Sequence, residues 1–199
     1  MVARALRPLV ALLVTSAIAV GCGGSSRTDG AATDTEDAPS TLDAASVVRD
    51  FDPSEPGAIA ALNEVALGSD AVSSLTPLLE DDDPITQWAA LYVVAIQVTD
   101  HDAGAALVPL LDDDDPITRV VAAASLSGLG YPEALPILAS GLTESATLPY
   151  RDPPRPIAEL AREALEAYTG RQFDDADSWQ SWLEKAAPLE WDGTSYVSG

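Results

Sequence analysis

Two acidic clusters hold the residues with the clearest potential for chemistry. Residues 80–83 read Glu-Asp-Asp-Asp and residues 112–115 read Asp-Asp-Asp-Asp; the clusters lie 32 residues apart, each directly before Pro-Ile-Thr. The last acid of each cluster has a structural explanation, because Asp followed by Pro is typical of a helix start. The remaining carboxylates exceed that need, and Ca²⁺ takes several oxygen ligands. The candidate metal ligands are Asp81, Asp82, Asp113 and Asp114.

The acidic clusters have two other interpretations. The sequence contains no Asp-x-Asp-x-Asp-Gly stretch, the pattern of a calcium-binding loop. A solvated edge and a site for a basic ligand each account for the carboxylates as well. Binding of calcium or of a basic ligand is therefore the alternative function, and a solvated acidic edge is the simpler expectation.

The rest of the composition argues against catalysis. The chain has one cysteine and one histidine, which leaves no intramolecular disulfide and no cysteine-based zinc site. His101 stands between Asp100 and Asp102 and is interpreted as a turn residue. Motifs for a nucleophile elbow, a dinucleotide site or a Walker A loop are missing from the sequence. We predict that the protein is not an enzyme and has no cofactor.

The net charge of −22, from 10 Lys and Arg against 32 Asp and Glu, argues against two classes of partner. Nucleic-acid binding draws its affinity from basic side chains that neutralise phosphates. Polybasic contacts with anionic lipids need the same side chains. We expect neither, and a basic partner, a cation or solubility alone remains open.

The single cysteine has a chemical role of its own. Residues 1–21 have the pattern of a secretory signal, with two arginines before an apolar run that is too short for a comfortable bilayer span of about 20 residues. Ala-Val-Gly before Cys22 resembles the lipobox of bacterial lipoproteins, although Ala19 stands where Leu is usual. The resemblance implies that Cys22 is acylated and becomes the mature N-terminus. An ordinary signal peptide with an unmodified cysteine is the alternative.

Residues 22–41 complete this N-terminal part. Gly, Ser, Thr, Asp and Ala dominate the segment, so it cannot bury enough apolar surface to order itself. We expect a lipidated cysteine on a disordered linker, held to a membrane by acyl chains. The expected location is the bacterial cell envelope. If the cell is Gram-negative, the absence of Asp after Cys22 favours the outer membrane, facing the periplasm or the surface.

The acidic clusters belong to a longer repeated stretch. Leu-Thr-Pro-Leu-Leu at 75–79 returns as Leu-Val-Pro-Leu-Leu at 107–111, and self-similarity at such a period is typical of stacked helical repeats. Apolar residues at helical spacing predict four helix pairs. The pairs span residues 42–68, 70–97, 102–130 and 132–170. We predict a helical domain over residues 42–187 and an irregular tail over residues 188–199.

These pairs resemble the short HEAT repeats of bacterial proteins. The resemblance rests on Leu-x-Pro-Leu-Leu in the first helix, an Asp-Asp-Pro turn, and a second helix rich in small residues, as at 121–130. Thr-Gly-x-x-Phe at 169–173 and Trp-x-x-Trp at 179–182 resemble the last element of some such proteins. The resemblance implies an all-α solenoid of about four pairs with a C-terminal capping helix. A binding role for the two tryptophans is the alternative.

The resemblance also implies a function. Second helices of HEAT units usually line the concave surface, so their polar residues are candidate contacts for a protein partner. These candidates are Gln87, Arg119, Glu159 and Arg162. The expected function is that of a non-catalytic, lipid-anchored scaffold, which presents this surface to an unidentified protein.

Overall fold

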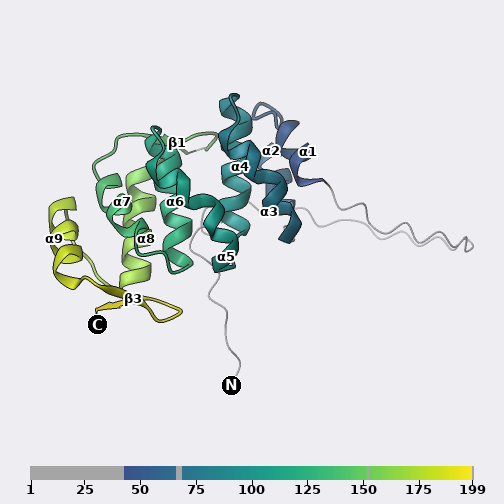
Figure 1. Cartoon of the computed structure of the whole chain (residues 1–199). Coiled ribbons are helices and arrows are strands. Elements are labelled where there is room, and N and C mark those ends of the chain that lie inside the picture. Colours follow the sequence, from purple (N-terminus) through teal and green to yellow (C-terminus); the bar gives the residue numbers. More distant parts are fainter. Residues whose placement is uncertain (1–42, 66–68, 152, 199) are drawn as a thin grey trace, which may run out of the picture.

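The computed structural model describes residues 43–65, 69–151 and 153–198, so Cys22, the signal segment and the linker lie outside the described residues. Figure 1 shows the helices in a row along which the chain advances from α1 to α9. The first helices of the pairs are α1 (Ala44–Arg49), α3 (Ser69–Leu75) with η2 (Thr76–Glu80), α5 (His101–Gly104) with η3 (Ala105–Asp112), and α7 (Ala134–Gly141). The second helices are α2 (Ala58–Glu64), α4 (Pro84–Gln97), α6 (Pro116–Gly128) and α8 (Ile157–Thr169), and α9 (Ala176–Ala186) follows them. The fold is an all-α helical-repeat solenoid, as the sequence predicts.

The second helices form one layer of this stack. In that layer α2 contacts α4, α4 contacts α6, and α6 contacts α8. The first helices lie on the other side, where α1 contacts α3 and α7 contacts α9. Each pair is also closed on itself, since α4 packs on η2 and α6 packs on η3. Successive pairs therefore bury one continuous core, as expected for a repeat architecture.

The first helices of the second and third pairs are less regular than the sequence suggested. Each was expected as one helix, but η2 and η3 are 3₁₀ segments. Pro77 lies at the start of η2 and Pro109 lies inside η3. Proline lacks the N–H of the helical ladder and clashes with the carbonyl four residues earlier, which favours the tighter 3₁₀ turn in short pieces.

The acidic clusters start the second helices, as predicted. Asp83 is the N-cap of α4, and its carboxylate accepts from the N–H groups of Ile85 and Thr86 at 3.4 and 3.1 Å. Asp115 makes the equivalent pair of bonds at α6, at 3.3 and 3.2 Å. The Thr86 hydroxyl, and then its N–H, hold the pKa of Asp83 below the usual value, because both donate to the ionised form.

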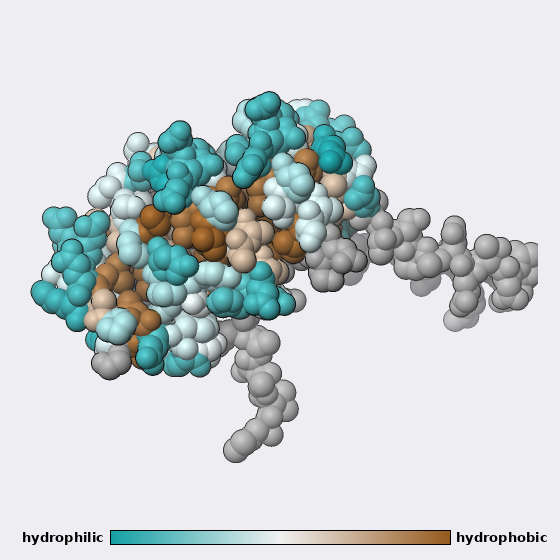
Figure 2. All heavy atoms as spheres, viewed as in Figure 1, coloured by the Kyte–Doolittle hydropathy of each residue, from teal (hydrophilic) through white to brown (hydrophobic). Residues whose placement is uncertain are grey.

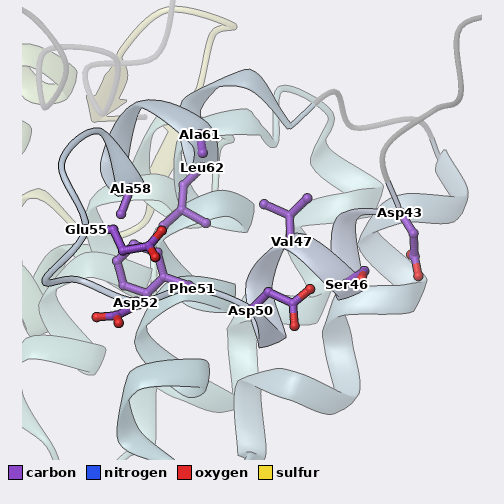
Figure 3. Close-up of a pocket in the computed structure, with 10 residues that line it drawn as sticks. All are labelled: Asp43, Ser46, Val47, Asp50, Phe51, Asp52, Glu55, Ala58, Ala61 and Leu62. Atoms are coloured by element: carbon purple, nitrogen blue, oxygen red, sulfur yellow. The ribbon is translucent and has the colours of Figure 1, made fainter.

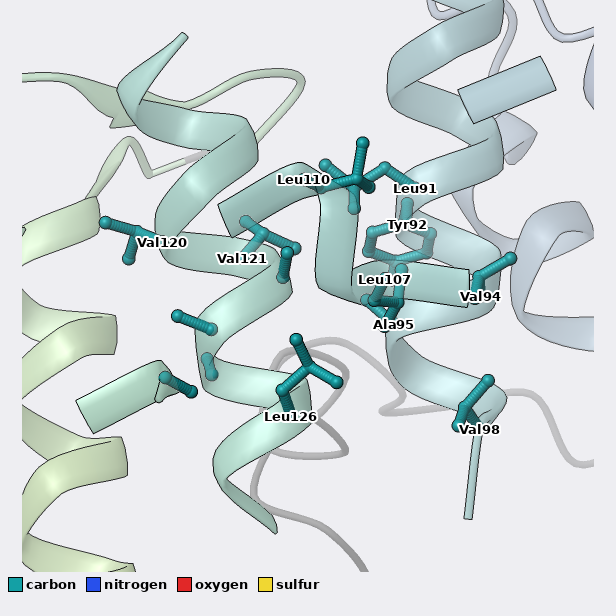
Figure 4. Close-up of a cluster of buried hydrophobic side chains, with 14 of the residues drawn as sticks. Leu91, Tyr92, Val94, Ala95, Val98, Leu107, Leu110, Val120, Val121 and Leu126 are labelled. Atoms are coloured by element: carbon teal, nitrogen blue, oxygen red, sulfur yellow. The ribbon is translucent and has the colours of Figure 1, made fainter. Parts of the chain in front are cut away.

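Small and branched apolar residues let neighbouring second helices pack closely. Figure 4 shows side chains of α4, η3 and α6 converging in the centre of the stack. Ala89 and Ala90 of α4, and Ala122 and Ala123 of α6, are fully buried. A hydrogen bond also joins the two repeats, because the buried Ser125 hydroxyl donates to the Ala95 carbonyl oxygen at 2.8 Å. No helix within the described residues is long and apolar enough to cross a membrane.

Aromatic residues close the C-terminal end. Trp179 of α9 is fully buried, and its ring lies 4.9 Å from that of Phe173 and 6.0 Å from that of Trp182, between centroids. The α9 helix packs against α7. These contacts confirm the predicted capping helix. Trp182 is only half-buried, and the Arg171 guanidinium carbon lies 5.9 Å from the centroid of its ring.

The tail was predicted to be irregular, and that prediction is wrong. Strands β3 (Leu189–Trp191) and β4 (Tyr196–Ser198) form an antiparallel hairpin, and β4 packs on α8. Trp191 covers the backbone at Gly130, where a Cβ would lie 2.6 Å from the indole Cδ1. Gly130 also has a φ of 89°, which favours glycine. The hairpin therefore packs against both the third and the fourth pair, beside α9 (Figure 1).

Candidate functional site

The long connection between α7 and α8 crosses the layer of second helices. This α7–α8 loop, residues 142–156, contains the short strands β1 (Thr147–Leu148) and β2 (Arg155–Pro156), which pair with each other. Figure 1 shows it running from the end of α7 past α6 towards α4. Leu148 is buried and lies with Leu91 of α4 and Val121 of α6 around a space of about 10 Å³. A space of that size is at the lower limit for one water molecule, so the loop is packed tightly onto the two helices.

The loop contributes to an aromatic cluster, defined here as Phe51, Trp88, Tyr92 and Tyr150. The Trp88 ring stacks on Tyr92 with centroids 5.0 Å apart and meets the edge of Tyr150, also at 5.0 Å. Phe51 lies 5.8 Å from Trp88 and 5.9 Å from Tyr150. The cluster therefore joins the first, second and fourth pairs on one surface. Ring pairs at these distances gain stability beyond the area they bury.

Arg151 places a positive charge beside the aromatic cluster. Its guanidinium carbon lies 5.8 Å from the centroid of the Tyr92 ring, within the range of a cation–π interaction. Burial raises the pKa of the Tyr92 hydroxyl, and the positive charge of Arg151 opposes that rise. The Tyr92 hydroxyl donates to Asn63 at 2.8 Å. The Nη2 atom of Arg151 is buried and has no hydrogen-bond partner within the described residues.

Tyr150 sits at the edge of this cluster in an unusual conformation. Its φ is 55°, in the left-handed region that side chains other than glycine rarely adopt, and 41% of the residue is exposed. Such a conformation costs about 1–2 kcal/mol for an L-residue. A buried donor without a partner, as at Arg151, is also costly. The loop thus holds an exposed tyrosine and a half-buried arginine on the second helices, in a strained backbone conformation at Tyr150.

Three of the four predicted partner contacts bond to the chain's own backbone. The Gln87 side chain donates to the Leu79 carbonyl oxygen at 3.0 Å, across the turn before α4. Arg119 occupies the equivalent position of the next repeat and donates to the carbonyls of Asp113 and Asp114 at 2.7 and 2.8 Å. These two side chains therefore hold the turns that precede their own helices.

The other two predicted contacts lie on α8. Arg162 donates to the carbonyl oxygens of Phe173 and Asp174 at 2.9 and 3.4 Å, and so fixes the segment between α8 and α9. Glu159, in the first turn of α8, is exposed. Their role as contacts for a partner stays a prediction. The structure adds an internal role for Arg162, as it does for Gln87 and Arg119.

Two of the four predicted metal ligands also form hydrogen bonds with the backbone of their own turn. The Asp81 carboxylate accepts from the Asp83 N–H at 2.9 Å, and the Asp113 carboxylate accepts from the Asp115 N–H at 2.8 Å. Each closes a side-chain turn that leads into the helix cap. Asp82 and Asp114 are exposed. Within the described residues no group of three or more His, Cys, Asp or Glu side chains is placed to hold a metal ion. The cation alternative stays a prediction.

The helical periodicity of the sequence does not reveal this site, because residues 143–154 lie outside the periodic segments. Trp88 is half-buried and faces the loop, whereas Tyr92 is buried. One signal was present, because Tyr150 and Arg151 are large side chains set among prolines. Aromatic residues and Arg are enriched at protein interfaces.

The comparisons with known proteins agree with this geometry. Residues 72–166, which run from α3 into α8 and include most of the aromatic cluster, match the family model of HEAT repeats. Neither a curated protein nor a solved structure gave a match. HEAT repeats commonly mediate protein–protein interaction and are generally not enzymes. The family match and the stacked helix pairs together identify residues 72–166 as HEAT-like repeats.

Proposed function

We propose that this chain is a non-catalytic scaffold of a bacterial cell envelope, anchored by a lipid on Cys22, and that it binds a protein partner at the aromatic cluster. The observation that carries the binding role is the cluster itself. Phe51, Trp88 and Tyr150 come from three repeats and share one surface, with Tyr150 left 41% exposed. Tyr, Trp and Arg are the residues that most often dominate binding energy at protein interfaces.

The rigid stack suits this role. Because the second helices contact one another in series, their surface is continuous over several repeats. A partner that lies across it meets side chains whose positions the core has already fixed, so little ordering free energy is lost on binding. Figure 2 shows apolar surface between hydrophilic projections on one face of the molecule. Polar surface around apolar patches is the usual composition of a binding face.

The location is supported by the sequence. The only cysteine of the chain follows a short apolar run and small residues, at the position where a lipoprotein is acylated. A linker of small and polar residues then separates it from the helical repeats. Two or more acyl chains hold a protein firmly on a membrane. If the cell is Gram-negative, the outer membrane is the favoured site, with the repeats facing the periplasm or the surface.

The binding role is tested by capturing partners from extracts of the organism's envelope with the purified chain. Tyr150→Ala removes the exposed ring at the edge of the cluster and is expected to lower the yield of the main captured protein. Val197→Ala is the matched control, because Val197 is a comparably exposed apolar residue, 43% exposed, on the C-terminal hairpin. Equal capture by wild type, Tyr150→Ala and Val197→Ala, with unchanged melting temperatures, would refute binding at the cluster.

Charge reversal at Arg119 or Arg162 is a weaker test. Both guanidinium groups hold backbone carbonyls of neighbouring segments. Their replacement by glutamate would disturb those segments as well as any contact with a partner. Tyr150→Ala reduces this ambiguity, because no hydrogen bond of the Tyr150 side chain joins it to the rest of the described chain, and the melting temperature reports the loss of its ring contacts with Phe51 and Trp88.

A further inference from the structure

A groove opens at the N-terminal end of the stack, between α1, the turn over residues 50–57, and α2. This N-terminal groove has a volume of about 460 Å³. Val47 and Phe51 form its apolar floor, and the fully buried Leu62 lies behind them. Figure 3 shows these three side chains lying among acidic side chains of the same segment. A volume of this size accommodates several inserted side chains.

The groove lies where a preceding repeat would pack. The α1 helix packs against α3 and α4, and α2 packs against α4, so the two helices have neighbours on the side of the second pair. Within the described residues no helix precedes α1 to cover the opposite side. Val47 and Phe51 consequently remain only half-buried. The space between two packed helices is the place into which a third helix fits its side-chain ridge.

The rim of the groove is acidic. It carries Asp43, Asp50, Asp52 and Glu55, and none of the described residues that line the groove is Lys or Arg. Asp43 caps α1, and Asp52 accepts from the N–H and the hydroxyl of Ser54. Within the described residues the carboxylates of Asp50 and Glu55 form neither an ion pair nor a side-chain hydrogen bond. Two carboxylates are therefore free to meet cations above an apolar floor.

We propose that the N-terminal groove binds a basic amphipathic helix of a partner protein. Its apolar side chains pack on Val47 and Phe51, and its Lys or Arg side chains reach Asp50 and Glu55. This inference rests on the proposed binding role and adds the chemistry of the partner. The groove is continuous with the aromatic cluster, because Phe51 belongs to both. An apolar helix face set into a groove is an established mode of peptide recognition, and complementary charge gives it orientation.

The test uses a labelled synthetic helix of leucine and lysine, about 18 residues long and patterned with helical periodicity, titrated into the purified whole chain. Ala61→Trp fills the groove from α2, where Ala61 is exposed and lines it. Ala60→Trp is the matched control, because Ala60 is its exposed neighbour and lies outside the lining. We expect affinity to fall about tenfold or more in Ala61→Trp, as for loss of a central contact, and to stay within about twofold in Ala60→Trp.

A second pair of variants separates the groove from general attraction to an acidic protein. Asp50→Asn with Glu55→Gln neutralises the free rim, and Asp82→Asn with Asp114→Asn removes the same charge from the exposed turns. Only the rim variant is expected to weaken binding, and the difference is expected to shrink at high salt because exposed charges are screened. The proposal that the groove binds a basic helix would be overturned by any of three results. These are equal losses of affinity from the two charge variants, equal affinities of Ala61→Trp and Ala60→Trp, or no binding to the wild-type chain.

Failure of the groove and failure of the proposed function give different results. Suppose that Ala61→Trp and Ala60→Trp bind the lysine peptide with equal affinity while Tyr150→Ala still lowers capture of the partner. Peptide binding in the groove is then refuted, and the proposed function stands. If Tyr150→Ala has no effect on capture while Ala61→Trp weakens peptide binding, the groove stands and binding at the aromatic cluster is overturned. A peptide with glutamate in place of lysine is expected not to bind in either case.

Discussion

Replacing Ser125 by alanine is expected to destabilise the repeat stack by about 1–3 kcal/mol, because it removes a buried hydrogen bond between two repeats. Ser125 lies on α6 with 2% of its surface exposed, and its hydroxyl donates to the Ala95 carbonyl oxygen of α4 at 2.8 Å. Ala95 lies in the last turn of α4, where carbonyls have no following helical N–H to pair with. The substitution leaves that carbonyl buried without its side-chain donor.

Ser127 provides a matched control on the same helix. It is fully buried, but its hydroxyl donates at 2.9 Å to Ala124, three residues earlier in α6. The Ala124 carbonyl lies four residues before Gly128, the last residue of α6, so the ordinary helical bond still serves it. Alanine is also the better helix former, by a few tenths of a kcal/mol. We expect Ser127→Ala to change stability by less than about 0.5 kcal/mol.

Thermal and urea unfolding followed by circular dichroism measure both variants. A domain of this size loses about 2–4 °C of melting temperature for each kcal/mol, so Ser125→Ala should melt several degrees below Ser127→Ala. Since the lost bond joins the second and third repeats, a broader transition is also expected, as cooperativity between repeats weakens. Equal melting temperatures for the two variants would show that the bond between repeats contributes nothing, and would refute the reasoning.

Three further predictions concern the anchor and the acidic turns. Cys22→Ala should abolish labelling by a fatty-acid analogue, and equal labelling of both chains would exclude the lipid anchor. Calcium should shift the melting temperatures of wild type and of the Asp82→Asn, Asp114→Asn variant equally, since no set of described carboxylates is arranged around an ion; a larger shift in wild type would support the cation alternative. Asp83→Ala should lower stability at neutral pH and progressively less below about pH 4, because a depressed pKa in the folded state stabilises it only while the carboxylate is ionised. Asp82→Ala, measured in parallel over the same pH range, should leave the melting temperature unchanged, and an identical pH profile for the two variants would contradict the cap.

Much of the architecture could be read from local patterns. The repeat at 75–86 and 107–118 indicated stacked pairs, and Asp-Pro marked the first residues of α4 and α6. A helix cap depends on a few adjacent residues, so it needs no tertiary information. The local role of Asp81 and Asp113 could also be predicted from the sequence, because a carboxylate that accepts from the N–H group two residues later is a local turn motif.

The roles of individual polar side chains were harder to foresee. Gln87, Arg119 and Arg162 carry the right chemistry for contacts with a partner. Their bonds to backbone carbonyls depend on where the adjoining turns pass in three dimensions. Carbonyls are present at every residue, so sequence gives no sign of which one a long side chain will reach. The hairpin at residues 189–198 escaped prediction for a related reason, since its short strands depend on docking against α8.

The sequence by itself determined the period of the repeats, the start of the second helices, the acidic surface and the position of the only cysteine. These properties follow from composition and from contacts between near neighbours in the chain. Only the tertiary structure decided that the α7–α8 loop brings Tyr150 onto Trp88 and Phe51, and that the first pair leaves an acidic groove open. A loop has no periodicity that reveals its path, and packing between residues far apart in the chain decides where its side chains lie.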